Sequence, residues 1–388
     1  MTELRLAATD ILPTDGPGQL VGRVWSNERG GPCPVVLDRN VLRDLSPIAP
    51  TMSGLLELAP DAIGDIGRLP TLGGLDDFLS GGFDKGSAGQ LLAPCDLQAV
   101  KAAGVTFAGS MLERVIEERA KGEPERAEAI RRELAPVVGE SLRGVEPGSE
   151  KAAKVKALLQ ERGLWSQYLE VGIGPDAEVF TKAQPMSSVG CGARVGVNAM
   201  SSWNNPEPEV VLAVNSRGEI RGAALGNDVN LRDVEGRSAL LLGKAKDNNG
   251  ACAIGPFIRL FDAGFGLADV EAAAVSLQII GQDGFTLEGE SLMSTISRPP
   301  AEIVRQTIGK SHQYPDGFML FLGTMFAPVK DRHAPGQGFT HEIGDEVRIS
   351  SPKLGALINV VDRCDVIDPW VFGTRALMEN LAGRGLLR

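Results

Sequence analysis

Three acidic side chains have the spacing of a divalent metal site. Glu207 and Glu209 lie two positions apart in the run WNNPEPE, and Asp228 follows downstream in GND. Residues two apart in a strand project from the same face, so the two glutamates would share one side. Neighbouring carboxylates repel unless a proton or a cation lies between them. Oxygen ligands without His or Cys favour Mg²⁺, with Mn²⁺ or Ca²⁺ as substitutes, over zinc.

The residues around these acids predict a β-hairpin. Two apolar runs, VVLAV and the strand after it, are separated by Asn215-Ser216-Arg217-Gly218, which are typical turn residues. The second strand returns toward the start of the first, so Asp228 would meet the two glutamates. The alternative is that Glu207 and Glu209 are exposed hairpin charges. Spacing alone leaves both interpretations open.

The remaining elements predict a mixed α/β chain that is mainly β between residues 177 and 361. Two further hairpins are expected at 272–293 and 344–361, from their alternating apolar patterns and turn residues. A buried strand is expected at 99–106, followed by two helices within 110–136 that are interrupted near Gly122-Glu123-Pro124. Residues 150–162 predict a charged surface helix. Ser110, with Glu113 three positions later, matches a helix N-cap.

Composition limits the classes of partner. The 388 residues include 39 Lys+Arg and 50 Asp+Glu, a formal net charge of −11, which argues against nucleic acid or anionic membrane as a partner. The sequence has no uninterrupted run of about 18 apolar residues, so no membrane-spanning helix is expected. The N-terminus has no secretory pattern, and five widely spaced cysteines without CxxC suggest reduced thiols, so we expect a cytoplasmic protein. We expect an N-terminal domain or layer at 1–90 and a catalytic domain at 91–388.

Several motifs, taken together and in order, resemble the fumarylacetoacetate hydrolase family. They cover roughly residues 91–365 and are AAGVTFAGSMLERVIEE, EVFTKAQP, PEPEVVLAVNSRGEIRGAALGNDVNLRD, LFLGTMFAP and GDEVRISSPKLGALINVV. The resemblance implies a β-sandwich roll with a smaller N-terminal domain. It also implies that Glu207, Glu209 and Asp228 hold a divalent metal, usually Mg²⁺, and that the protein is a homodimer or homotetramer.

The same resemblance bears on the reaction. Family members that hydrolyse C–C bonds carry an H-x-x-E motif whose His activates water, but here Ser110 stands at the His position and Glu113 keeps its place. A serine alone is too weak a base near neutral pH, so hydrolysis is disfavoured. The GVTF-x-x-S-x-x-E-R pattern instead resembles a branch of 2-keto-3-deoxy-pentonate dehydratases. This implies an Mg²⁺-dependent hydro-lyase that converts 2-keto-3-deoxy-D-xylonate to 2,5-dioxopentanoate in oxidative pentose degradation.

Dehydration requires a base, an acid and positive charge near the keto acid. Glu178 is the expected acid or base, because an apolar pocket raises the pKa of a glutamate. The resemblance places Lys246, favoured over Lys244 by its spacing to Gly255, beside the keto acid. The expected substrate-binding residues are Ser110, Lys182 and Thr324, with Lys182 supporting the pocket and an N-cap role as the alternative for Ser110.

Two other functions stay open at this point. The first is an acylpyruvate-type C–C hydrolase or an oxaloacetate decarboxylase that uses the same metal with a different proton relay. The second is a non-catalytic module that binds sugar acids. Schiff-base chemistry at Lys246 is a further alternative, but a metal site would make it redundant. Substitution of Glu178 separates catalysis from simple binding.

Overall fold

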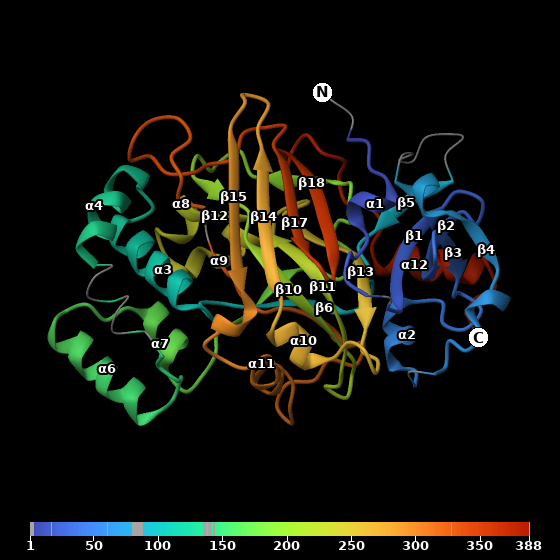
Figure 1. Cartoon of the computed structure of the whole chain (residues 1–388), viewed down its shortest axis with the longest axis horizontal. Helices are drawn as coiled ribbons and strands as arrows, with labels where there is room; N and C mark the ends of the chain where they lie inside the picture. The colour runs from blue at the N-terminus through green and yellow to red at the C-terminus, as the bar shows by residue number, and fades with distance from the viewer. Residues whose placement is uncertain are drawn as a thin grey trace.

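Two twisted β-sheets packed against each other form the centre of the computed structural model (Figure 1). The structure describes residues 4–16, 18–59, 61–79, 88–134, 138, 142, 144–326 and 328–387. Helices surround two main β-sheets, which confirms the expected mixed α/β, mainly β fold.

The larger sheet has 11 strands and runs from the N-terminal segment to the centre of the molecule. In spatial order its strands are β4 (Thr71–Gly74), β3 (Val41–Asp44), β2 (Gly31–Asp38), β1 (Leu20–Ser26), β13 (Cys252–Leu260), β11 (Ile220–Asp228), β10 (Pro208–Val214), β16 (Phe318–Phe321), β6 (Ala99–Ala103) and β7 (Val179–Ala183). The eleventh strand, β5 (Gly89–Leu92), also pairs with β1. All these pairs are antiparallel except that of β16 with β6.

The smaller sheet has five strands and covers one face of the larger one. Its order is β15 (Thr286–Leu292), β14 (Ala274–Ile280), β17 (Glu346–Ser351), β18 (Gly355–Arg363) and β8 (Arg194–Val197). A separate two-stranded ribbon consists of β9 (Asn204–Asn205) and β12 (Asn230–Leu231). The three hairpins expected from the sequence are present as β10–β11, β14–β15 and β17–β18.

Alternation along β10 determines which side chains enter the space between the sheets. Val210, Leu212 and Val214 belong to the main apolar cluster, where β14, β17 and β18 pack against β10, β11 and β13. Val211 and Ala213 face the opposite side and join a second cluster. Because residues two apart share a face, Glu209 lies on the side of Val211, away from the interior of the sandwich.

Helices cover the edges of this core. They are α1 (Ala8–Ile11), α2 (Met52–Glu57), α3 (Ala108–Ala120), α4 (Pro124–Leu134), α6 (Glu150–Glu161), α7 (Gln167–Ile173), α8 (Arg232–Glu235), α9 (Leu242–Lys246), α10 (Leu267–Glu271), α11 (Pro300–Thr307) and α12 (Thr374–Gly383), with 3₁₀ turns η1 (Ile66–Arg68), η2 (Leu75–Phe78), η4 (Ala239–Leu241) and η5 (Met293–Thr295). Figure 1 shows α3, α4, α6 and α7 grouped on one side, where they share an apolar cluster. Among the helices described, none combines the length and apolar composition of a bilayer span.

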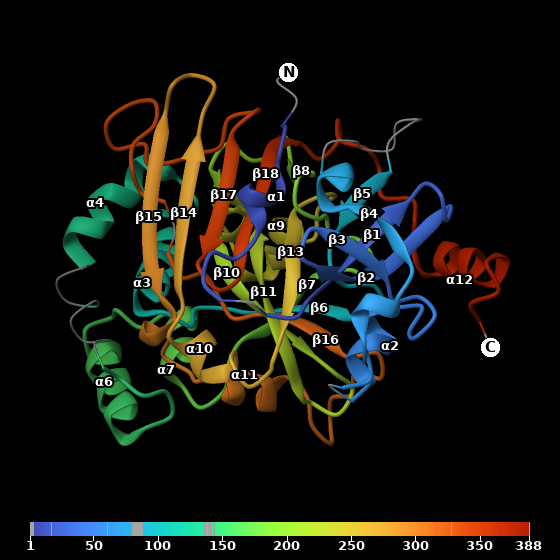
Figure 2. The ribbon, with the colours of Figure 1, turned by 45° about the vertical axis from the view of Figure 1, so that its right-hand side comes forward.

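The N-terminal strands form the opposite flank, together with α12 (Figure 2). They continue the larger sheet, because β1 pairs with β13 through Leu20–Arg259 and Val21–Ile258. α12 contacts this flank through Asn380, whose side chain donates to the Gly30 carbonyl. The division of the chain at residue 90 stays a prediction.

The sequence located the interrupted helix correctly but not the start of its first half. α3 ends at Ala120, Lys121 takes a left-handed conformation, and α4 begins at Pro124. The N-cap of α3 is Phe107, so Ser110 is the third residue of the helix, and the N-cap role expected for it is wrong. The Ser110 hydroxyl nevertheless bonds the Phe107 backbone, donating to its carbonyl at 2.8 Å.

Candidate active site

The three acids identified from the sequence come together on the outer face of the β10–β11 hairpin. The Asp228 amide donates to the Glu207 carbonyl at 3.1 Å, which places these two residues opposite each other at the open end of the ladder. Glu209 lies two residues further along the first strand. One carboxylate oxygen from each of the three residues lies within 4.8 Å of the other two, and all three residues are about 1% exposed.

Two cations contact the first of these acids. Lys246, at the end of α9, places Nζ 2.5 Å from Glu207 Oε2 and 3.0 Å from Asp228 Oδ2. Arg114, from α3, bonds Glu207 Oε1. Burial alone would raise the pKa of Glu207, but Lys246 and Arg114 outweigh it and lower that pKa to about 2. Glu207 is therefore a carboxylate at neutral pH.

Glu209 has the opposite environment. Its carboxylate accepts from the Gly323 amide at 2.7 Å and from the Thr324 hydroxyl at 3.4 Å. Among the residues that the structure describes, no Lys, Arg or His nitrogen lies within ion-pair distance of it. Burial, followed by Asp228 and Glu207, raises the pKa of Glu209. This side chain therefore needs a proton or a further cation.

These observations fit a hard divalent cation. Three buried carboxylates converge, and one of them has no cationic partner among the described residues. The donors are all oxygen, which suits Mg²⁺, Mn²⁺ or Ca²⁺. Glu207, Glu209 and Asp228 are therefore the residues that could hold the ion.

Lys182 contacts Asp228 from the side that faces away from the pocket. Its Nζ lies 2.9 Å from Asp228 Oδ1 and donates to the Lys246 carbonyl at 2.7 Å, with no exposed surface. It does not belong to the described wall of the pocket. The structure thus places Lys182 in contact with a predicted metal ligand, away from the space open to a substrate.

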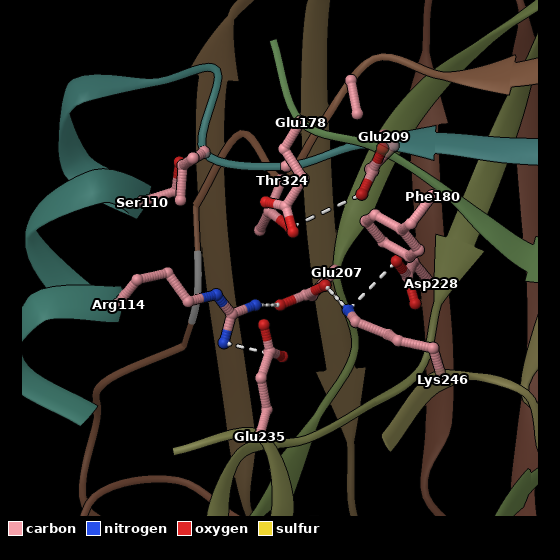
Figure 3. Close-up of a pocket in the computed structure, with 13 residues that line it drawn as sticks. Ser110, Arg114, Glu178, Phe180, Glu207, Glu209, Asp228, Glu235, Lys246 and Thr324 are labelled. Atoms are coloured by element: carbon pink, nitrogen blue, oxygen red, sulfur yellow. Dashed lines mark hydrogen bonds and ion pairs between the residues drawn. The ribbon is translucent and has the colours of Figure 1, made fainter. Parts of the chain in front are cut away.

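A pocket of about 320 Å³ opens directly onto the three acids (Figure 3). Its described lining is Ala103, Gly104, Val105, Ser110, Arg114, Glu178, Phe180, Glu207, Glu209, Asp228, Glu235, Lys246 and Thr324. The pocket brings together every residue predicted for the site except Lys182, whereas Lys244, the rival of Lys246, is exposed.

Glu178 enters this pocket immediately before β7. Burial raises the pKa of its carboxyl, against the opposing effects of Arg114 and Lys246. Glu178 therefore lines the pocket in the position expected for an acid or base. Val105, beside it on the pocket wall, has φ 46°, a strained conformation for a β-branched residue. Such strain often marks a functional site.

Ser110 and Thr324 line the pocket from two elements, α3 and the segment after β16. Thr324 donates to Glu209 Oε1. The Ser110 hydroxyl donates to the Phe107 carbonyl and accepts from the Phe107 amide at 3.3 Å, so its oxygen has one further lone pair for a ligand.

The two charged pocket residues missed from the sequence are Arg114 and Glu235. Arg114 follows Ser110 by one helical turn and therefore shares its face, so the spacing could have identified it. Glu235 is the last residue of α8, which follows β12, and it has no local sequence signal. Arg114 Nη1 lies 3.2 Å from Glu235 Oε2 and 2.5 Å from Glu117 Oε2.

A second layer of ion pairs joins the pocket to the helices. Arg232, stacked on Trp203, donates to Glu117 at 2.7 Å and to Glu113 at 2.9 Å. Glu113 also pairs with Arg131 of α4 at 2.8 Å. Glu113 therefore connects α3, α4 and α8 and does not line the described pocket.

None of the three histidines lines the described pocket. His341 is buried with Nδ1 3.3 Å from Asp345, His333 pairs with Glu342 on the surface, and the backbone of His312 bonds that of Gly309. Family members that hydrolyse C–C bonds use a His of the H-x-x-E motif to activate water. The described pocket therefore contains no counterpart of that motif.

Comparison with known proteins places this site in context. No protein-family model matches the chain. Over 186 residues the chain is 31% identical to "2-dehydro-3-deoxy-D-arabinonate dehydratase" of Saccharolobus solfataricus, covering 48% of this chain and 59% of that protein. Over 202 residues it is 30% identical to "Probable 2-keto-3-deoxyxylonate dehydratase" of Haloferax volcanii, covering 52% and 66% respectively. The matches thus span less than two thirds of either relative.

Solved structures share the fold over a longer range. An apo 2-keto-3-deoxy-D-arabinonate dehydratase aligns with a TM-score of 0.60 at 21% identity, over 89% of this chain and 99% of that chain. A form of that dehydratase complexed with magnesium and 2,5-dioxopentanoate aligns with a TM-score of 0.59. Fumarylacetoacetate hydrolase from Exiguobacterium antarcticum aligns with a TM-score of 0.55 at 16% identity, over 89% of this chain and 99% of that chain. The chain therefore has the fold of the fumarylacetoacetate hydrolase structures, and about half of it is related in sequence to proteins named 2-keto-3-deoxy-pentonate dehydratases.

Proposed function

We propose that this protein is a metal-dependent hydro-lyase that dehydrates 2-keto-3-deoxy-D-xylonate to 2,5-dioxopentanoate. The observation that carries the proposal is the pairing of the buried carboxylate triad with Glu178 in a described pocket that no histidine lines. Dehydration needs proton transfer and charge stabilisation, whereas hydrolysis needs an activated water. The names of the sequence relatives support the same choice.

The names of the two relatives are consistent with a single substrate. D-Xylonate and D-arabinonate differ only in configuration at C2 and C3. A keto group at C2 and a methylene at C3 remove both differences, so 2-keto-3-deoxy-D-xylonate and 2-keto-3-deoxy-D-arabinonate are the same compound. The only remaining stereocentre is C4, so the open question is which C4 epimer the pocket accepts.

The chain's own residues divide the work. Glu207, Glu209 and Asp228 would hold Mg²⁺, with Mn²⁺ or Ca²⁺ as substitutes. When bound, the cation supplies Lewis-acid stabilisation of negative charge on the keto oxygen. Glu178 accepts a proton from C3, and its raised pKa brings the carboxylate nearer to the strength that such a base needs at neutral pH.

The cationic side chains complete the charge balance. Lys246 stays protonated, because Asp228 and Glu207 raise its pKa more than burial lowers it. Its ammonium group and the Arg114 guanidinium therefore keep positive charge beside the triad. Ser110 and Thr324 offer hydroxyl oxygens to the substrate, and Lys182 orients Asp228.

The decisive test incubates the purified full chain with Mg²⁺ and each C4 epimer of 2-keto-3-deoxy-pentonate. Proton NMR should show the aldehyde of 2,5-dioxopentanoate, and chelation should abolish turnover. Failure with both epimers while Mg²⁺ binds would refute the proposal. Faster turnover of an acylpyruvate or oxaloacetate would favour the hydrolase or decarboxylase alternative. A role in pentose degradation, a homo-oligomeric state and a cytoplasmic location remain predictions.

A further inference from the structure

Glu235 is a buried carboxyl that faces the pocket from the side opposite Glu178. In Figure 3 the two side chains approach Glu207 from opposite directions, Glu178 from above and Glu235 from below. The Glu235 side chain is 6% exposed. Its Oε2 lies 3.2 Å from Arg114 Nη1 but accepts no well-aligned hydrogen bond from the described residues.

The surrounding charges do not explain this group as a structural ion pair. Arg114 also contacts Glu117 at 2.5 Å and bonds Glu207, so one guanidinium faces three carboxyls. Burial, opposed by Arg114 and Lys246 and reinforced by Glu207 and Glu117, raises the pKa of Glu235 to about 7. A protonated form of this side chain is therefore accessible near neutral pH.

The dehydration itself requires such a group. Hydroxide is a poor leaving group, so an acid must protonate the C4 oxygen as the C4–O bond breaks. Glu178 serves as the base, and Lys246 is held by Glu207 and Asp228. Of the described pocket residues, Glu235 is the further carboxyl outside the proposed metal ligands and Glu178.

We infer that Glu235 is the general acid of this site, acting on the C4 hydroxyl while Glu178 acts on C3. The inference rests on the proposed function. The C3–H bond breaks and its proton goes to Glu178, while the electron pair forms the C3=C4 double bond. The C4–O bond breaks, its electrons stay on oxygen, and the Glu235 proton completes a water molecule.

The same two carboxyls can return to their starting states. Glu235, now ionised, takes a proton from C5, and the protonated Glu178 returns its proton to C3. The double bond thereby moves to C4=C5, which gives the enol of the C5 aldehyde. Both glutamates regain their first protonation state, and protonation at C4 with loss of the enol O–H proton completes 2,5-dioxopentanoate without an oxidant or reductant.

The test separates acid from base by changing the leaving group. Glu235→Gln is assayed on 2-keto-3-deoxy-D-xylonate, on its 4-deoxy-4-fluoro analogue, and for C3 deuterium exchange into 2-oxobutanoate. Fluoride departs without prior protonation, and 2-oxobutanoate has no leaving group. We expect a loss of about 10²- to 10⁴-fold on the hydroxyl substrate, a much smaller loss on the fluoro analogue, and nearly unchanged exchange.

Glu113→Gln is the matched control, because Glu113 belongs to the adjoining ion network but does not line the described pocket. Thermal unfolding and Mg²⁺ titration check that Glu235→Gln is folded and binds metal. If it is poorly folded, Glu235→Asp, which retracts the carboxyl by one methylene, takes its place with the same expected pattern.

Three results would overturn the inference. An unchanged rate on the hydroxyl substrate removes the acid role. Equal losses in all three assays show that Glu235 is structural. If wild-type protein turns over neither C4 epimer, the proposed function fails and the inference fails with it, which differs from an active wild type with an indifferent Glu235→Gln variant.

Discussion

Gly104 lies directly against the carboxylate of Glu178. A Cβ built on Gly104 would come within 1.8 Å of Glu178 Oε2 and 2.6 Å of Cδ. The Gly104 amide also donates to the Glu178 carbonyl at 3.2 Å, so backbone and side chain are held by the same neighbour. The absence of a side chain at residue 104 therefore provides the space that the predicted base occupies.

Gly104→Ala should displace the Glu178 carboxylate and lower kcat/KM by roughly 10²-fold, since a shift of about 1 Å at a reacting group can cost that much. Steady-state kinetics with saturating Mg²⁺ measures the loss. Gly109→Ala is the control, because a Cβ there meets nothing within 4 Å. Equal activity of the two variants would show that the contact does not position Glu178.

The two glutamates of the triad should respond differently to neutralisation. Glu207→Gln removes one carboxylate partner from each of Lys246 and Arg114, although Lys246 keeps Asp228 and Arg114 keeps two other glutamates. It should lower the free energy of unfolding by about 1–3 kcal/mol. Glu209→Gln removes a buried carboxylate that has no cationic partner among the described residues, so stability without metal should be unchanged or higher. Denaturation in the presence of a chelator measures both.

Mg²⁺ affinity provides the second half of this prediction. Both variants should bind Mg²⁺ at least about tenfold more weakly, since each loses an oxygen ligand of full charge. Calorimetric titration measures this, with Glu219→Gln on the surface as the control. Retained affinity in either variant would contradict the ligand assignment for that residue.

Glu113 should be important for stability and not for turnover. Glu113→Gln weakens the contacts with Arg232 and Arg131, so unfolding should become easier by about 1–3 kcal/mol. Because Glu113 does not line the described pocket, kcat should change little. A large loss of kcat in a stably folded variant would instead indicate that Glu113 takes part in catalysis.

His341 should make stability depend on pH. Burial lowers its pKa more than Asp345 raises it, so the unfolded chain binds a proton here at higher pH than the folded one. This contribution to stability is complete above about pH 6.5 and is lost as pH falls toward the folded pKa. His341→Gln should therefore flatten the fall in unfolding free energy below about pH 6.5.

His333→Gln, at a half-exposed position, is the control for this measurement and should keep the wild-type slope. Urea denaturation at several pH values gives the free energies. A slope that is the same in His341→Gln and in wild type would assign the pH dependence to other groups.

Local patterns were sufficient for much of the fold. Turn residues between apolar runs located all three hairpins, and Pro124 located the break between α3 and α4. The pairing of Glu207 with Glu209 followed from the two-residue period of a strand, and the hairpin brought Asp228 to them. These features depend on residues near one another in the chain, which is why spacing predicts them.

Tertiary structure decided the contacts between distant segments. The sequence predicted the N-cap of α3 at Ser110, whereas the structure has it at Phe107. Lys182 turned out to lie behind Asp228, and Glu113 pairs with α4 and α8. Glu235 reaches the pocket only because α8 packs beside α3.

By itself, then, the sequence determined the hairpins and the acidic triad, because both arise from the regular geometry of one strand pair. Which cation neutralises which carboxylate was decided by the packing of α3, α8 and α9 around that pair. That choice depends on distance and burial in three dimensions, and no interval along the chain encodes it.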